Sequence, residues 1–112
     1  MEINVAANAF LALGQELRLK IFHRIVNAWP LGIRPNELKI DLAIPQATLS
    51  FHLKHLLQAK FISVEKEGTS LYYLANKNKL QEMITELQHI EEKMDQTTQV
   101  GQAKPRIKVK LE

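Results

Sequence analysis

The segment between Gln46 and Lys54 carries side chains whose chemistry suits base edges and phosphate oxygens. Gln46 can make a paired donor–acceptor contact with adenine, and Ser50 can donate to or accept from a base edge. Thr48 and Lys54 suit phosphate oxygens. Phe51 is a liability in water but can contact a thymine methyl group. The segment therefore predicts contacts with DNA from Gln46, Ala47, Thr48, Ser50, Phe51 and Lys54.

Two histidines lie in the same segment and have a different interpretation. His52 adjoins the apolar stripe described below, so we expect a packed imidazole that is hydrogen-bonded to the backbone rather than a base contact. His55 is expected to be exposed. Taken alone, a polar helix face is as readily a solvated surface as a binding surface, so the surrounding elements must decide between the two.

These side chains need a helix that follows a short turn. Pro45 breaks the chain, and Leu49, Leu53, Leu56 and Leu57 then recur at the spacing of a buried helical stripe, which predicts a helix over 46–59. Pro35 suits the first turn of a preceding short helix over 35–42. Residues 43–45 connect the two, so the segment predicts a helix-turn-helix.

The residues after this helix change period from helical to alternating. Ile62 and Val64 alternate with polar residues, as do Leu71 and Tyr73, and Gly68 lies between the two runs, which predicts a β-hairpin. The hairpin tip is expected to reach a phosphate or the minor groove, and an ordinary solvated tip is the other interpretation. The candidate contacts there are Lys66, Thr69 and Ser70.

Three further helices are predicted from apolar spacing. They cover residues 2–13, 16–28 and 77–94. Their predicted inward stripes are Ile3, Ala6, Phe10 and Leu13; Leu17, Ile21, Ile25 and Ala28; and Leu80, Met83 or Ile84, Leu87, Ile90 and Met94. The expected fold is mainly α with a small β-hairpin, a winged helix-turn-helix in the order α-α-α-α-β-β-α. The last stripe needs a partner, so we expect a homodimer through the first and last helices.

Composition and charge bound the remaining possibilities. The 112 residues carry a net charge of +3, all of it in 93–112, so residues 1–92 are neutral overall. We expect one domain over 1–94 and a flexible basic tail over 95–112, with Leu111-Glu112 a possible vector remnant. No membrane span or signal peptide is apparent and cysteine is absent, which predicts a cytoplasmic or nucleoid-associated protein.

With these elements in order, the chain resembles the ArsR/SmtB family of bacterial winged-helix repressors. Residues 11–22 (Leu-Ala-Leu-Gly-Gln-Glu-Leu-Arg-Leu-Lys-Ile-Phe) are similar to the family's opening segment, and 45–56 (Pro-Gln-Ala-Thr-Leu-Ser-Phe-His-Leu-Lys-His-Leu) to its recognition helix. Residues 67–74 are similar to its wing. The resemblance covers about 8–92 and is closest to an arsenic-responsive branch. It implies a homodimer that represses transcription from an inverted-repeat operator until an inducer lowers its affinity.

The sensing residues of that family are mostly missing from this chain. A Cys-x-Cys metal site would begin at Arg34, and there is no cysteine anywhere. A second zinc site matches at His89 and Glu92 but has Asn76 and Asn78 where Asp and His are expected, and asparagine is a poor zinc ligand. We therefore expect no metal and no cofactor, with His89 and Glu92 as residual candidates only.

No glycine-rich phosphate loop or nucleophile motif is present, so no enzymatic activity is predicted. The leading hypothesis is a sequence-specific repressor that binds double-stranded DNA. A small organic molecule, another protein or a weak His/Glu metal site would then control release. The neutral charge of 1–92 keeps an alternative open, a protein-interaction or dimerisation module without specific DNA binding.

Overall fold

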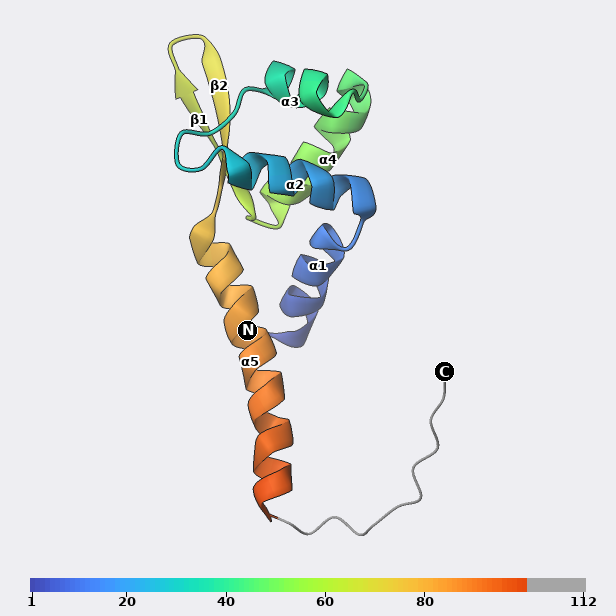
Figure 1. Cartoon of the computed structure of the whole chain (residues 1–112), viewed down its shortest axis with the longest axis vertical. Helices are drawn as coiled ribbons and strands as arrows, with labels where there is room; N and C mark the ends of the chain where they lie inside the picture. The colour runs from blue at the N-terminus through green and yellow to red at the C-terminus, as the bar shows by residue number, and fades with distance from the viewer. Residues whose placement is uncertain (101–112) are drawn as a thin grey trace.

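The computed structural model describes residues 1–100, with side chains as far as Gln96. Its helices are α1 (Ile3–Leu13), α2 (Glu16–Asn27), α3 (Pro35–Leu42), α4 (Gln46–Gln58) and α5 (Lys77–Val100), and its strands are β1 (Ile62–Glu67) and β2 (Ser70–Ala75). The order α-α-α-α-β-β-α confirms the predicted fold class. Figure 1 shows α3, α4 and the hairpin at one end of the molecule, with α5 projecting from the other.

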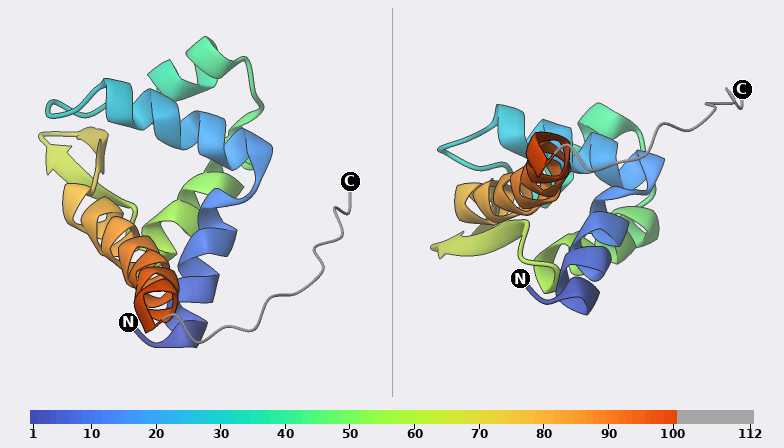
Figure 2. Two further views of the ribbon diagram at one scale, coloured as in Figure 1. Left: turned by 60° about the horizontal axis from the view of Figure 1, so that its bottom comes forward. Right: turned by 90° about the horizontal axis from the view of Figure 1, so that it is seen from below.

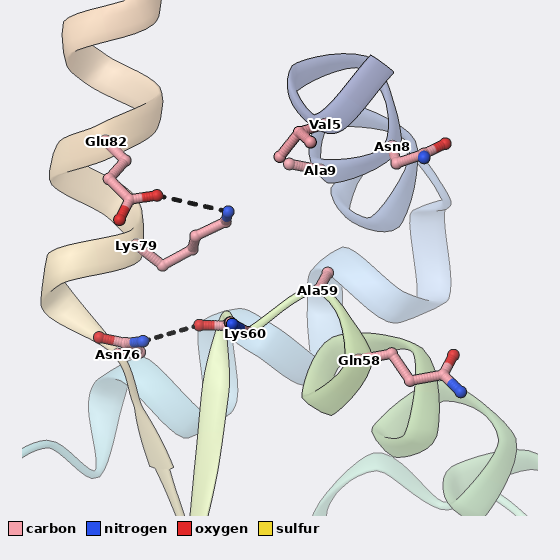
Figure 3. A pocket seen from close by; sticks show the side chains of 9 residues that line it. All are labelled: Val5, Asn8, Ala9, Gln58, Ala59, Lys60, Asn76, Lys79 and Glu82. Atoms are coloured by element: carbon pink, nitrogen blue, oxygen red, sulfur yellow. Dashed lines mark hydrogen bonds and ion pairs between the residues drawn. The ribbon is translucent and has the colours of Figure 1, made fainter. Parts of the chain in front are cut away.

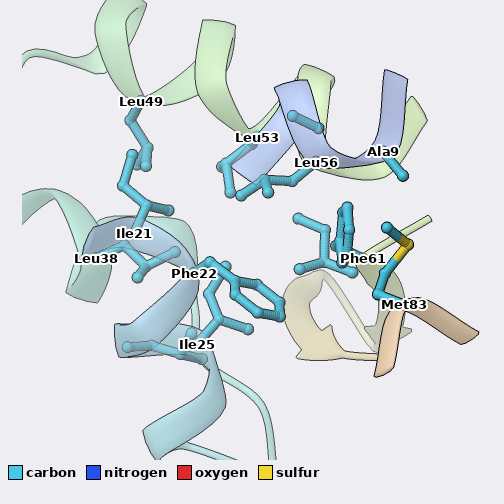
Figure 4. Packing of buried hydrophobic residues seen from close by; sticks show 13 residues of the cluster. Ala9, Ile21, Phe22, Ile25, Leu38, Leu49, Leu53, Leu56, Phe61 and Met83 are labelled. Carbon is cyan, nitrogen blue, oxygen red and sulfur yellow. The ribbon is translucent and has the colours of Figure 1, made fainter. Parts of the chain in front are cut away.

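The core forms where α2 crosses α4. Ile21 and Ile25 of α2 are fully buried, as are Leu49 and Leu56 of α4, because each helix repeats its apolar residues on one face. Phe61, in the turn between α4 and β1, is also fully buried. Figure 4 shows these side chains converging between the helices. Helix α4 is therefore held in place by its leucine stripe, as predicted.

The two strands pair antiparallel, with Ile62 opposite Ala75 and Glu67 opposite Ser70. A two-residue turn joins them, and Gly68 adopts φ 62° at its first position, where a hairpin turn favours glycine. The loop before α3 is attached to this hairpin, because Ile33 N–H donates to the Tyr73 carbonyl at 3.0 Å and Tyr73 N–H donates back at 2.8 Å. The hairpin is thereby tied to the helix-turn-helix.

The first helix buries a face that matches the predicted stripe only in part. Its buried side chains are the alanines Ala6, Ala9 and Ala12, whereas Ile3 is 86% exposed and Phe10 is at the surface. Small side chains allow α1 to approach its neighbours closely, and the larger apolar ones then point outward. The predicted stripe is therefore correct for Ala6 and for Leu13, which packs half-buried against the core, and wrong for Ile3 and Phe10.

The last helix is longer than predicted. It continues to Val100 instead of ending at Met94, so it takes in residues 95–100 of the predicted tail. Residues 101–112, which hold the rest of that tail and Leu111-Glu112, lie outside the described residues. Over the described part of the chain, no helix is long and apolar enough to cross a membrane.

The apolar stripe of α5 is only half covered. Met83 is buried in the core, but Leu87 and Ile90 are about half exposed and continue the same stripe toward the C-terminal end of the helix. Helices α1 and α5 are in contact with each other and lie side by side in the left view of Figure 2. Figure 1 shows α5 extending past the end of α1. A stripe of this length exposed to water indicates a contact with another surface.

Candidate nucleic-acid interface

The turn between α3 and α4 aims the first residues of α4 outward. Ala43 adopts the left-handed conformation at φ 51°, which ends α3. Pro45 is extended and its carbonyl accepts from Leu49 N–H at 3.0 Å, which starts the next helix at Gln46. The fully buried Leu38 and Leu49 pack the two helices into the common core. The short turn therefore fixes one helix relative to the other.

The predicted contact residues of α4 lie on its outer face. Gln46, Ala47, Ser50, Phe51 and Lys54 are exposed and Thr48 is half-buried. Gln46 Nε2 donates to Ser50 Oγ at 3.1 Å, one helical turn apart. Each side chain keeps its remaining donors or acceptors directed to solvent, since neither has another hydrogen bond in the described structure. Together they present a compact polar surface at the start of the helix.

Phe51 is unusual among these residues because it is a large apolar side chain that is 55% exposed. Its ring packs edge-on against the His55 ring at 4.6 Å between centroids and against the His52 ring at 5.2 Å. The two imidazoles restrict the phenyl ring from one side and leave its other side open. His55 is consequently half-buried, and not exposed as predicted.

His52 is packed, as expected, but its partner is a side chain and not the backbone. Its Nδ1 accepts from Arg18 Nε at 3.2 Å, so the neutral ring carries its proton on Nε2. Arg18 Nη1 also donates to the Ala12 carbonyl at 3.1 Å. The hydrogen-bonded group of Ala12, Arg18 and His52 connects α1, α2 and α4. The sequence patterns did not single out Arg18, because an arginine within a predicted helix is ordinarily expected to lie at the surface.

The burial of His52 beside Arg18 makes the stability of the fold depend on pH. Burial, and then the positive charges of Arg18 and His55, lower the pKa of His52 below its ordinary value of 6.5. The unfolded chain therefore binds a proton more readily than the folded one. The resulting stability is fully present above about pH 6.5 and is lost as the pH falls toward the folded-state pKa.

We expect the free energy of unfolding to fall between pH 7.5 and pH 5.5 by more in the wild-type protein than in His52→Gln. Glutamine can accept from Arg18 without titrating. Urea unfolding at the two pH values measures the difference. His23→Gln, a change to an exposed histidine on α2, is the matched control and should keep the wild-type pH dependence. Equal pH dependence in all three proteins would contradict the assignment.

The wing residues do not share one face of the hairpin. Lys66 pairs with Leu71, whereas Ser70 pairs with Glu67 on the opposite face, because successive residues of a strand alternate in direction. Thr69 is exposed at the tip, next to Gly68. Lys66 and Thr69 can therefore approach one ligand together, but Ser70 lies beside an acidic side chain.

The residual metal candidates are exposed and isolated. His89 and Glu92 lie one turn apart on α5. Within residues 1–100, no group of three or more histidine and acidic side chains is placed to hold a metal ion. Asn76 is engaged elsewhere, since its Nδ2 donates to the Lys60 carbonyl at 2.8 Å. Asn76 therefore stabilises the turn after α4.

A cavity of about 400 Å³ lies between α1, α5 and the turn after α4 (Figure 3). Lys79 reaches into it and is only 8% exposed. Its Nζ is 3.5 Å from Glu82 Oε2 and 6.0 Å from the centroid of the Phe61 ring. The charge of Lys79 is therefore compensated within its own helix.

The fold of this chain is similar to that of several solved structures. No protein-family model and no curated protein sequence matches the chain. An ArsR-like transcriptional regulator from Rhodococcus sp. RHA1 is similar in structure, with a TM-score of 0.79 and 22% identity over 87% of this chain and 89% of that one.

Two further solved structures are similar. A homodimeric winged helix-turn-helix DNA-binding domain from Mycobacterium bovis, a possible ArsR-family regulator, has a TM-score of 0.64 at 18% identity, over 80% of this chain and 81% of that one. The transcriptional repressor BigR from Xylella fastidiosa has a TM-score of 0.59 at 23% identity, over 78% and 86%. The chain therefore has the winged helix-turn-helix fold of ArsR-type transcriptional regulators.

Proposed function

We propose that this protein is a sequence-specific DNA-binding transcriptional regulator that represses transcription as a homodimer in the cytoplasm. The observation that carries the proposal is the exposed start of α4. There Gln46, Ser50 and Phe51 face outward from a helix whose other side is anchored in the core. A surface with two hydrogen-bonding side chains and one exposed aromatic ring is better suited to contact a major groove than to remain in water.

The individual roles follow from the chemistry of each side chain. Gln46 and Ser50 read base edges, and Phe51 contacts a thymine methyl group or a sugar. Thr48 and Lys54 contact phosphates, as do Lys66 and Thr69 of the wing. The hydrogen bond between Gln46 and Ser50 holds both side chains ready for this contact. Ser70 is the weakest of the candidates, because it shares its face of the hairpin with Glu67.

The homodimer is supported by the uncovered stripe of α5 and by the similar M. bovis domain, which is homodimeric. Two recognition helices related by a two-fold axis would contact an inverted repeat. The similar structure of a transcriptional repressor supports repression as the outcome of binding.

The test is to select an operator from random duplexes and measure how two variants bind it. Gln46→Ala should lose about 1–3 kcal/mol on the operator and much less on a random duplex, because it removes a base contact. Lys54→Ala should weaken binding to both duplexes and lower the salt dependence by about one unit of slope per site. Fluorescence anisotropy at several salt concentrations measures both quantities.

Lys20→Ala is the control for charge. Lys20 is an exposed lysine on α2, and its Nζ lies 3.9 Å from Glu16 Oε1. Because Lys20 is not one of the proposed DNA contacts, its loss should leave the salt slope unchanged. Equal losses by Gln46→Ala on operator and random DNA would contradict base recognition. Failure to bind any duplex would instead favour the alternative, a protein-interaction module of this fold.

A second candidate for the signal that controls DNA release is a metal ion. It would bind weakly to His89 and Glu92, at a site formed across the dimer. It is favoured only by the spacing of these two residues on an exposed helix face. If zinc or nickel leaves operator affinity unchanged while a metabolite still releases the DNA, the hypothesis of a regulatory metal site is eliminated.

A further inference from the structure

Arg18 is a buried cation that has no acidic partner in the part of the chain that the structure describes. It is 8% exposed, and its side chain donates only to two neutral acceptors, His52 Nδ1 and the Ala12 carbonyl. A guanidinium stays charged at every physiological pH, and a buried charge is ordinarily paired with an opposite one. No carboxylate among the described residues forms an ion pair with it. The positive charge of Arg18 is therefore uncompensated.

A cavity of about 350 Å³ opens beside this charge, between α1, α2 and α4. Asn8, His55 and Gln58 supply polar groups to its wall, and Leu11 supplies an apolar surface. Figure 3 shows the amides of Asn8 and Gln58 pointing away from α5 and from Lys79. Among the described residues that line the cavity, none is acidic. Its size is that of a small-molecule site.

Resting on the proposed function, we propose that this cavity binds a small organic carboxylate whose binding releases the operator. The carboxylate pairs with the Arg18 guanidinium, the amides of Asn8 and Gln58 donate to it, and its apolar body contacts Leu11. The cavity beside Lys79 lacks this chemistry because Lys79 already pairs with Glu82. The uncompensated charge of Arg18 next to the apolar side chain of Leu11 thus determines the class of ligand.

The same site is connected to the recognition helix. Arg18 Nε donates to His52, one residue after Phe51, and His55 and Gln58 belong to the same helix α4. A carboxylate that takes a paired contact from the guanidinium competes with His52 Nδ1 for Nε. Ligand binding therefore weakens the connection between α2 and α4. Because coupling is reciprocal, operator binding must also lower ligand affinity.

The first experiment measures binding without DNA, by titrating the ¹⁵N-labelled full-length protein with sodium benzoate. We expect saturable shifts of the amide signals around Arg18, His52 and Gln58. Benzamide, which has the same shape without the charge, should bind at least about tenfold more weakly, and so should inorganic phosphate, which lacks the apolar body. Equal binding of benzoate and benzamide, phosphate binding as tight as benzoate, or shifts confined to other elements would overturn the proposal.

Variants of the cavity wall provide the second readout. Arg18→Met should weaken benzoate at least about tenfold. Because this change removes a buried network and can unfold the chain, Asn8→Ala and Gln58→Ala, at exposed positions, are measured alongside it. Each should weaken benzoate about threefold or more. Asn36→Ala, at an exposed position on α3, should have no effect. Wild-type affinity in both amide variants would overturn the site.

The third readout is the coupling to DNA. Saturating benzoate should raise the Kd for the selected operator at least about fivefold relative to sodium chloride at the same ionic strength. Saturable benzoate binding with an unchanged Kd would overturn the effector role. If no duplex binds at all, the proposed function fails, and the DNA-free titration still tests the cavity separately.

Discussion

Replacing Leu87 and Ile90 together by glutamate should convert the protein to a monomer and lower its operator affinity at least about 100-fold. Both side chains are about half exposed on the continuation of the α5 stripe, beyond the point where Met83 is buried. Two carboxylates in a dimer interface would have to be desolvated without partners, which is unfavourable. A monomer contacts one half-site only, so it loses the contacts of the second recognition helix.

Analytical ultracentrifugation and operator anisotropy measure the two effects, and circular dichroism checks the fold. Gln88→Glu adds one carboxylate at the neighbouring exposed position of α5 and is the control for acidic charge on this helix. It should stay dimeric. A double variant that remains dimeric would show that the interface lies elsewhere. A monomeric variant with wild-type operator affinity would show that DNA binding does not need the dimer.

Phe61→Ala should destabilise the fold by about 3–5 kcal/mol, a large part of the total stability of a domain of this size. Phe61 is fully buried, and its ring packs edge-on against the Phe22 ring at 5.7 Å between centroids. Figure 4 shows it close to Met83 of α5 and Leu56 of α4. Truncation would leave a cavity where α4, the β-hairpin and α5 meet.

Phe51→Ala is the same chemical change at an exposed position. Because Phe51 is 55% exposed, it should lower the free energy of unfolding by less than about 1 kcal/mol while weakening operator binding. Urea unfolding and anisotropy on both variants separate the two roles. Similar losses of stability from both substitutions would contradict the distinction between a core phenylalanine and a surface one.

Local patterns in the sequence predict the elements of this fold well. The leucine stripe of α4, the alternation of Ile62 and Val64, and the proline at Pro35 each depend on neighbours a few residues away. Such signals are read directly from spacing, because helices and strands repeat at 3.6 and 2 residues. The exposed residues at the start of α4 follow from the same periodicity, once the buried stripe is assigned.

The errors arose where contacts between distant segments decide the outcome. α1 buries its alanines instead of Ile3 and Phe10, because close approach to neighbouring helices favours small side chains over large ones. The predicted end of α5 lies six residues before the observed one. Residues 95–100 contain neither proline nor glycine, and the first glycine follows directly after them. Helical propensity alone does not resolve such a boundary.

The sequence by itself determined the order of the elements, the helix-turn-helix and the face of α4 that is free to contact a ligand. Only the tertiary structure brought Arg18 to His52, which is 34 residues away, and opened a cavity beside that buried charge. The physical reason is that burial and charge compensation are properties of the folded surroundings. No local spacing records which side chain from another helix will accept a hydrogen bond.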